Sequence, residues 1–295
     1  MMIRFTALTA ATFMVLMPLT ATAGPGGNGG GPSIPPVFES GSPSGIVIQE
    51  AGGYQYGYNM AGLTITGEGA LPILPAGYTL VAGDKIGWPD LDGNGISDIV
   101  IQHSGGFQYA YLMQDAGAFV SVLSEGAIPA LPATYSILGW PDLDGDGDTD
   151  MVIQEPGGFT FAYLMNGLSV DDSGPVPGLP PGSYTTIGFP DLDGQNGDDI
   201  VIQEAGGFTY AYLMNGLTTA SEGQVPGLPP GNYSTIGFPN LDDANGADIV
   251  IQDTGGYTYA YLMNGLATAS EGQVPGLPPG NYSTIPWAEF WSVLP

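Results

Sequence analysis

The sequence has no cysteine and almost no cationic side chains: lysine and arginine together number 2, and histidine 1, in 295 residues. Without cysteine, no disulfide bond can hold the fold, so packing or bound metal must stabilise it. Aspartate and glutamate number 29, which gives a formal net charge of −27. A charge of this sign excludes nucleic acid as a partner and argues against binding to anionic membrane surfaces.

Charged residues of either sign are also scarce, at 11% of the chain, which is not the composition of a protein built from long helices. Glycine and proline are abundant instead, with 49 and 27 residues. This balance favours an all-β fold in which many short strands are joined by tight turns.

The N-terminus carries an apolar stretch that Thr6, Thr9, Thr12 and Pro18 interrupt. Residues 5–19 follow a short segment that contains Arg4, and the small-x-small sequence Ala21-Thr22-Ala23 comes next. This pattern predicts a secretory signal peptide over residues 1–23, cleaved near Ala23, and a secreted, periplasmic or extracellular location. No later stretch is long enough to span a bilayer, so no membrane insertion of the mature chain is expected. The Gly- and Pro-rich residues 24–40 are predicted to be a linker.

Residues 41–295 form an internal repeat. A glutamine that follows an apolar triplet marks each copy, and successive copies are separated by 53, 52, 49 and 49 residues; the glutamines are Gln49, Gln102, Gln154, Gln203 and Gln252. Periods of this size indicate a propeller or a solenoid. Within the copy near residue 240, residues 233–238, 248–252, 257–263 and 266–270 are predicted to be strands, with tight turns after the second and third. Four antiparallel strands per copy correspond to one propeller blade.

The two ends of the repeat complement each other. The first copy begins with a second strand at residues 45–49, whereas the last copy has a spare first strand at residues 282–287. Pairing of these segments would complete one shared blade and leave no exposed sheet edge. The sequence therefore predicts a five-bladed β-propeller with four antiparallel strands per blade, closed by pairing of the N- and C-terminal segments.

Each complete copy carries an acidic loop between its first and second strands. The loops cover residues 90–98, 142–150, 191–199 and 240–248, and we number their positions 1 to 9. Oxygen-bearing side chains recur at positions 1, 3, 5 and 9: Asp90, Asp92, Asn94 and Asp98; Asp142, Asp144, Asp146 and Asp150; Asp191, Asp193 and Asp199; Asn240, Asp242 and Asp248. In the first two loops, Gly95 and Gly147 occupy position 6, where a calcium loop turns sharply.

Carboxylates at this spacing repel one another unless a cation lies among them. Their hard oxygen ligands favour Ca2+ as the cofactor. The alternative is an aspartate-rich turn without metal, and four loops at matched spacing make this alternative the weaker one. Gln195 replaces the acid at position 5 of the third loop, and Ala244 offers no ligand there in the fourth.

The acidic loop, the apolar strand after it and the Tyr-Leu-Met-Asn-Gly turn of residues 163–167, 212–216 and 261–265 resemble the FG-GAP/VCBS repeat proteins. These are integrin-alpha-like calcium-binding β-propellers. The resemblance covers about residues 45–290. It implies calcium in the loop between the first two strands of a blade, and extracellular adhesion or ligand binding.

Two sets of recurrent aromatic residues are interpreted as packing. Each third strand carries a triplet such as Phe107, Tyr109 and Tyr111, and one aromatic residue precedes each acidic loop. Stacking platforms for sugars are the alternative, and the loops near Trp88 and Trp140 would be the first place to look for them. The sole histidine, His103, fills a position that is acidic in the other copies, so a catalytic role is not expected.

These patterns predict a non-enzymatic binding or adhesion module for an extracellular glycan or protein ligand. An enzyme normally breaks the symmetry of its repeats to build one site, whereas here the acidic positions recur copy by copy. A carboxylate-based glycoside hydrolase using the central channel is one alternative. A purely structural extracellular module is another.

Overall fold

The computed structural model describes residues 44–49, 52–61, 64–81, 88–117, 119–132, 134–176, 184–204, 206–225, 233–244 and 246–274. Within these ranges all regular structure is β-strand, and the strands form five antiparallel sheets. No helix in this part of the chain is long and apolar enough to cross a membrane. The predicted signal peptide, the linker and the strand at residues 282–287 lie outside the described residues.

The first sheet contains β1 (Ser44–Gln49), β2 (Gln55–Ala61) and β3 (Thr64–Leu71). The second contains β4 (Tyr78–Leu80), β5 (Ile99–His103), β6 (Gln108–Asp115) and β7 (Val120–Ile128). The third contains β8 (Ser136–Gly139), β9 (Met151–Gln154), β10 (Thr160–Asn166) and β11 (Ser169–Pro175). The fourth contains β12 (Tyr184–Gly188), β13 (Ile200–Glu204), β14 (Thr209–Asn215) and β15 (Thr218–Gln224). The fifth contains β16 (Tyr233–Gly237), β17 (Ile249–Asp253), β18 (Thr258–Asn264) and β19 (Ala267–Gln273).

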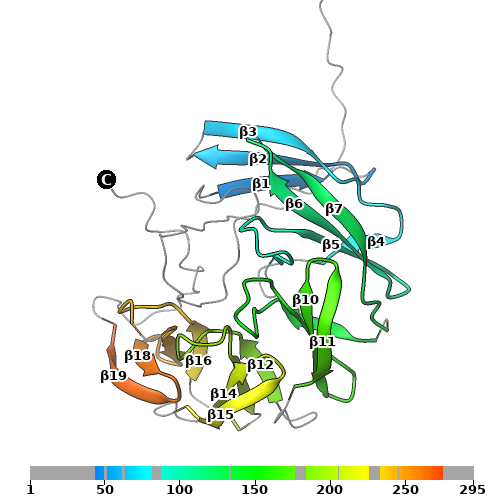
Figure 1. Ribbon diagram of the computed structural model, residues 1–295. Coiled ribbons are helices and arrows are strands. Elements are labelled where there is room, and N and C mark those ends of the chain that lie inside the picture. The colour runs from blue at the N-terminus through cyan, green and yellow to red at the C-terminus, as the bar shows by residue number, and fades with distance from the viewer. Residues whose placement is uncertain are drawn as a thin grey trace, which may run out of the picture.

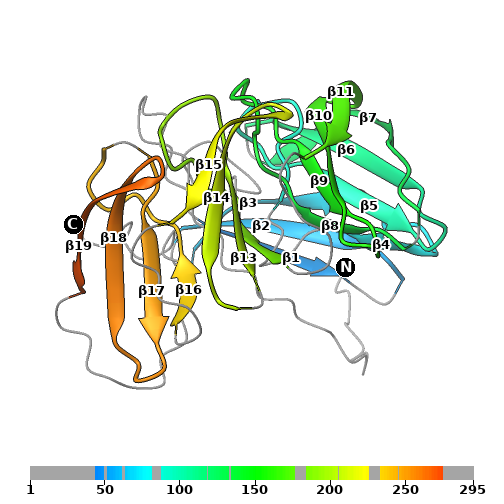
Figure 2. The same cartoon turned by 90° about the horizontal axis from the view of Figure 1, so that it is seen from below.

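Consecutive sheets succeed one another around an arc (Figure 1). The fourth and fifth sheets remain neighbours when the molecule is turned by 90° (Figure 2). In every four-stranded sheet the strands pair in chain order, each with the next. A series of antiparallel meanders around an arc is the blade arrangement of a β-propeller.

The strands predicted for the copy near residue 240 are confirmed to within a few residues, as β16 to β19. The first sheet also begins with a second-type strand, as predicted, because β1 pairs with β2 in the way that β5 pairs with β6. Among the described residues, no strand pairs with the other edge of β1.

The apolar triplets of the second strands are buried because each sheet packs between two others. In the third sheet, Met151 and Ile153 pack with the core of the second sheet, whereas Val152 packs with Ile200 and Ile202 of the fourth. Alternate side chains of one strand therefore enter different intersheet cores. This explains why a continuous apolar run, and not an alternating one, forms these strands.

The aromatic residue before each acidic loop belongs to this core. Trp88, Trp140, Phe189 and Phe238 are all buried. A glycine of the preceding sheet makes room for the ring: a Cβ added to Gly139 would lie only 2.6 Å from the Phe189 ring. The packing interpretation is confirmed for these residues, and the rings of Trp88 and Trp140 do not form sugar platforms.

Candidate functional site

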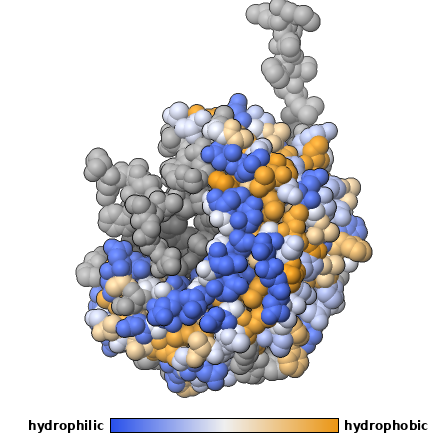
Figure 3. Space-filling model, in the orientation of Figure 1, coloured by the Kyte–Doolittle hydropathy of each residue, from blue (hydrophilic) through white to orange (hydrophobic). Residues whose placement is uncertain are grey.

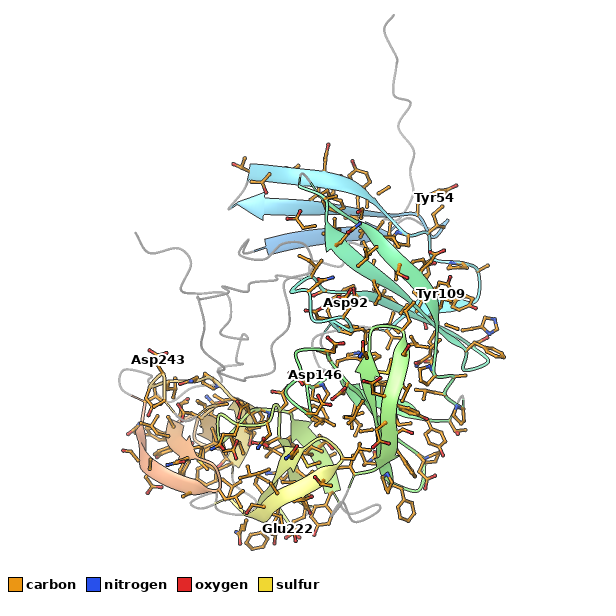
Figure 4. All side chains as sticks on the ribbon, in the orientation of Figure 1. Tyr54, Asp92, Tyr109, Asp146, Glu222 and Asp243 are labelled. Atoms are coloured by element: carbon orange, nitrogen blue, oxygen red, sulfur yellow. The ribbon has the colours of Figure 1, made fainter. Side chains whose placement is uncertain are left out.

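The acidic loops connect the first and second strands of the second to fifth sheets. Figure 4 labels Asp92, Asp146 and Asp243, which lie toward the middle of the arc, whereas Tyr54 lies at its outer edge. The face seen in Figure 3 carries a hydrophilic band along this inner side. The loops therefore gather on one side of the molecule.

In three loops the structure brings the carboxylates at positions 1, 3 and 9 together. One carboxylate oxygen from each residue lies within 4.8 Å of the others in three groups: Asp90, Asp92 and Asp98; Asp142, Asp144 and Asp150; Asp191, Asp193 and Asp199. Hard oxygen donors at such separations can converge on a single cation. These groups match the positions that the sequence selected.

The aspartate at position 1 shapes the loop around the group. Asp142 Oδ1 accepts a hydrogen bond from the Gly145 amide (2.7 Å) and Oδ2 accepts one from the Gly147 amide (3.0 Å). Both glycines have positive φ, 75° and 100°, a conformation that side chains disfavour. The glycine predicted from the calcium-loop pattern is thus required by the backbone. In the third loop Asn196 takes the corresponding conformation, with φ of 61°.

Asp146, the acidic residue at position 5, is not part of the carboxylate group of its loop. Asn94 Oδ1 accepts a hydrogen bond from the Ile96 amide (2.8 Å), and its Nδ2 donates to the Met113 carbonyl (2.7 Å). Asp146 Oδ1 accepts a hydrogen bond from the Asp148 amide (2.9 Å). Position 5 therefore has a local structural role in addition to its predicted one as a ligand.

The aspartate at position 9 is a buried clamp. Asp150 Oδ2 accepts a hydrogen bond from the Leu143 amide and Oδ1 accepts one from the Met165 amide, both at 2.8 Å. The carboxylate thereby joins the start of the loop to the third strand of the same sheet. Asp98, Asp199 and Asp248 make the same pair of bonds. The calcium-loop pattern predicts only a ligand role for this residue. Its retention in the fourth loop, where the position 5 ligand is lost, is the sequence feature that indicates a further role.

Neighbouring loops are hydrogen-bonded to each other, which the sequence analysis did not predict. In the second, third and fourth loops, the residue at position 8 contacts position 1 of the loop before it. The Thr149 amide donates to the Asp90 carbonyl (2.7 Å), and Thr149 Oγ1 accepts from the Asp90 amide (2.9 Å). Asp198 repeats both bonds with Asp142. A distortion of one loop would therefore reach the next.

Burial disfavours the charged form of these carboxyls. It raises the pKa of Asp98, Asp150 and Asp199 to about 8, although hydrogen bonds from two backbone amides lower the pKa of each. Repulsion between neighbouring carboxylates raises the pKa further. Burial likewise raises the pKa of Asp90 to about 7. Asp92 Oδ1 is buried without a hydrogen-bond partner. An acceptor left unpaired among carboxylates that resist ionisation fits a bound cation.

The described residues include no lysine or arginine at these loops. The chain's two basic side chains, Arg4 and Lys85, both lie outside the described residues. In the fourth loop, only two of the four ligand positions carry carboxylates, Asp242 and Asp248, while Asn240 Oδ1 is buried without a partner. The four loops thus share one backbone design but differ in ligand charge.

The pKa values predict how the metal-free protein responds to pH. Because the folded pKa of Asp98, Asp150 and Asp199 is about 8, above an unfolded value near ~3.9, folding takes up protons. This contribution is fully present below about pH 4 and is lost as pH rises through about 8. With excess chelator, urea unfolding should give greater stability at pH 5 than at pH 8.5, and greater stability at pH 8.5 would contradict the prediction.

His103 lies at the far end of β5 from the acidic loop. Its Nδ1 accepts a hydrogen bond from the Gly105 amide (3.0 Å), and its ring lies 5.1 Å from that of Tyr78 and 6.5 Å from that of Phe107. A ring that caps a turn and packs on aromatic neighbours has a structural role. The non-catalytic interpretation of His103 stays a prediction.

The sequence matches no protein-family model and no curated protein. Among solved structures, it is similar to YCF48 from Cyanidioschyzon merolae, with 15% identity, coverage of 81% of this chain and 72% of that chain, and a TM-score of 0.44. It is also similar to BBS1N in complex with ARL6DN, with 14% identity over 79% of this chain, 65% of that chain and a TM-score of 0.33. The C-terminal WD40 domain of Sif2 matches with 13% identity over 92% and 66%, and a TM-score of 0.37. The chain therefore spans about two thirds of BBS1N and of the Sif2 domain, and likenesses this distant carry no argument about its function.

Proposed function

We propose that the protein is an exported β-propeller whose acidic loops bind calcium and whose surface binds an extracellular protein or carbohydrate. The observation that carries the calcium assignment is the convergence of three carboxylates in each of three loops. The resemblance of the loops to FG-GAP/VCBS repeats supports the same assignment. The repetition of the loops from sheet to sheet favours binding over catalysis, because an enzyme concentrates its chemistry at one site.

Calcium suits these loops better than magnesium or zinc. The donors are carboxylate oxygens from a single loop, and calcium accepts six to eight oxygen ligands with irregular geometry. Magnesium demands a near-octahedral set, and zinc prefers nitrogen and sulfur ligands, which the loops lack. Calcium would also supply the positive charge that Asp90, Asp98 and their counterparts need when ionised.

The number and quality of ligands rank the four sites. We expect the loops at 90–98 and 142–150 to bind best, the loop at 191–199 less well and the loop at 240–248 least, because Ala244 and Asn240 reduce its charge. Titration calorimetry should show that Asp144→Ala loses more bound calcium than Asp242→Ala. Equal losses would contradict the ranking, and absence of calcium binding by the unchanged protein would overturn the proposed calcium function.

The same proposal includes a closed ring of five blades. It is supported by the edge of β1 that has no partner among the described residues and by the strand predicted at residues 282–287. Deleting residues 282–295 should expose that edge and promote aggregation. Light scattering and thermal melting would test this, and a truncated protein that stays monomeric with an unchanged melting temperature would exclude closure by this strand.

A further inference from the structure

The hairpin between the second and third strands carries an exposed aromatic residue in successive sheets. The exposed fractions are 58% for Tyr54, 64% for Phe107, 51% for Phe159 and 38% for Tyr257, while Phe208 is partly exposed. Each of these residues is the first of the aromatic triplet, and the packing interpretation is wrong for the four exposed ones. Large rings held in water at equivalent positions indicate a surface that contacts a partner.

These hairpins lie at the opposite end of the strands from the acidic loops. In the third sheet, β9 begins directly after the loop at 142–150 and ends directly before the hairpin at 155–159. Figure 4 shows the corresponding Tyr54 at the outer edge of the arc, away from Asp92 and Asp146. The aromatic residues therefore form a surface separate from the calcium loops.

A carboxylate and the exposed ring flank one turn glycine. A methyl group added at Gly157 would lie 3.1 Å from Glu155 Oε1 and 3.6 Å from Phe159 Cδ2. At Gly206 the corresponding distances are 3.0 Å to Glu204 Oε1 and 3.7 Å to Phe208 Cδ2. We call this arrangement, a carboxylate and a ring beside the same turn glycine, the hairpin notch. Its two walls are an acceptor with negative charge and an aromatic ring.

The tyrosine that immediately precedes β8 orients the carboxylate in the third sheet. Tyr135 OH donates a hydrogen bond to Glu155 Oε2 (3.1 Å), while Oε1 is the oxygen beside the notch. In the fifth sheet Asp253 Oδ1 instead accepts from the Gly255 amide (2.9 Å) and the Tyr257 amide (2.8 Å). The glutamate notches of the third and fourth sheets are therefore the ones with an acceptor available to a ligand.

We propose that these two notches bind arginine side chains of a partner protein, which deepens and rests on the proposed binding function. A guanidinium group stacks on an aromatic face and donates several hydrogen bonds to a carboxylate, so one side chain matches both walls. The chain carries a net charge of −27, and none of its described residues is a lysine or arginine that could neutralise Glu155 or Glu204. The same charge attracts a basic partner over long range, whereas a neutral glycan gains nothing from it.

The test uses the full calcium-loaded chain and a labelled peptide of arginine alternating with glycine and serine. The variant Phe159→Leu with Phe208→Leu keeps the net charge and an apolar side chain but removes both rings. Fluorescence anisotropy should show affinity falling about tenfold, because each exposed cation–π contact contributes modestly. Phe159→Tyr with Phe208→Tyr should retain the affinity. An unchanged affinity after both rings become leucine would overturn the proposal.

A matched pair separates the notch from general negative charge. Glu155→Gln with Glu204→Gln removes two notch carboxylates, whereas Glu222→Gln with Glu271→Gln removes two exposed carboxylates on β15 and β19. The first pair should weaken peptide binding clearly more than the second, and equal losses would overturn the proposal. Binding of a soluble neutral glucan that depends on the same rings, with no ring dependence for the peptide, would assign the notches to carbohydrate instead. Calcium titration of the same variants should be unchanged, so failure of the notch proposal is distinguishable from failure of the calcium function.

Discussion

Calcium should raise the melting temperature of this protein steeply, and chelation should lower it. In the folded chain Asp98, Asp150 and Asp199 are fully buried, and each has its loop's other carboxylates beside it. If each site binds calcium with a Kd of roughly 0.1 mM, ~10 mM calcium adds about 2.7 kcal/mol per site to the free energy of unfolding. The two best loops would then add about 5 kcal/mol, which is comparable to the whole stability of a marginal domain.

Scanning calorimetry after dialysis at low salt, with and without chelator, measures this effect. High sodium should restore only part of the lost stability, because it screens repulsion without supplying ligand bonds. Magnesium at the same concentration is the matched control for divalent charge, and it should act less than calcium because the loops do not impose octahedral geometry. A melting temperature indifferent to chelator would mean that the loops are aspartate turns without a metal role.

The repeat made the local fold predictable from sequence. Apolar triplets before each glutamine gave the second strands, and paired glycines and the Asn-Gly dipeptides gave the hairpins, because each of these signals depends on residues close in the chain. The convergence of positions 1, 3 and 9 also follows from one nine-residue loop. Closure was not testable in this way, because its strand at residues 282–287 lies outside the described part of the chain.

Contacts between sheets could not be read from the same patterns. The bonds from Thr149 and Asp198 to the preceding loop join residues 59 and 56 positions apart, and nothing local distinguishes these side chains from ordinary turn residues. Alternation along the third strand placed Phe107, Tyr109 and Tyr111 on one face, but it did not indicate how deeply each side chain is buried. Phe107 lies in the hairpin, just before the first residue of β6, and for this reason its side chain is exposed.

Replacing the clamp aspartate should destabilise the protein even where metal contributes least. The fifth sheet allows this test, because the loop at 240–248 has the poorest ligand set but keeps the clamp: Asp248 accepts hydrogen bonds from the Leu241 amide (2.7 Å) and the Met263 amide (2.8 Å). Asp248→Ala leaves both amides without their acceptor. Since each unsatisfied buried donor costs about 1–3 kcal/mol, we expect a loss of about 3 kcal/mol or more.

Asp242→Ala is the matched control within the same loop. Asp242 is exposed, and its Oδ1 accepts one hydrogen bond, from the Ala244 amide (3.0 Å), so its loss should cost less than about 1 kcal/mol. Asp248→Asn keeps one acceptor oxygen, so its loss of stability should fall between those of the two alanine variants. Urea unfolding in saturating calcium compares all three with the unchanged protein. If Asp248→Ala and Asp242→Ala lost equal stability, position 9 would have no role beyond that of any other acidic residue in the loop. A larger loss at Asp248 that persists when the unfolding is repeated in excess chelator would show that this carboxylate holds the loop to β18 whether or not a cation is bound.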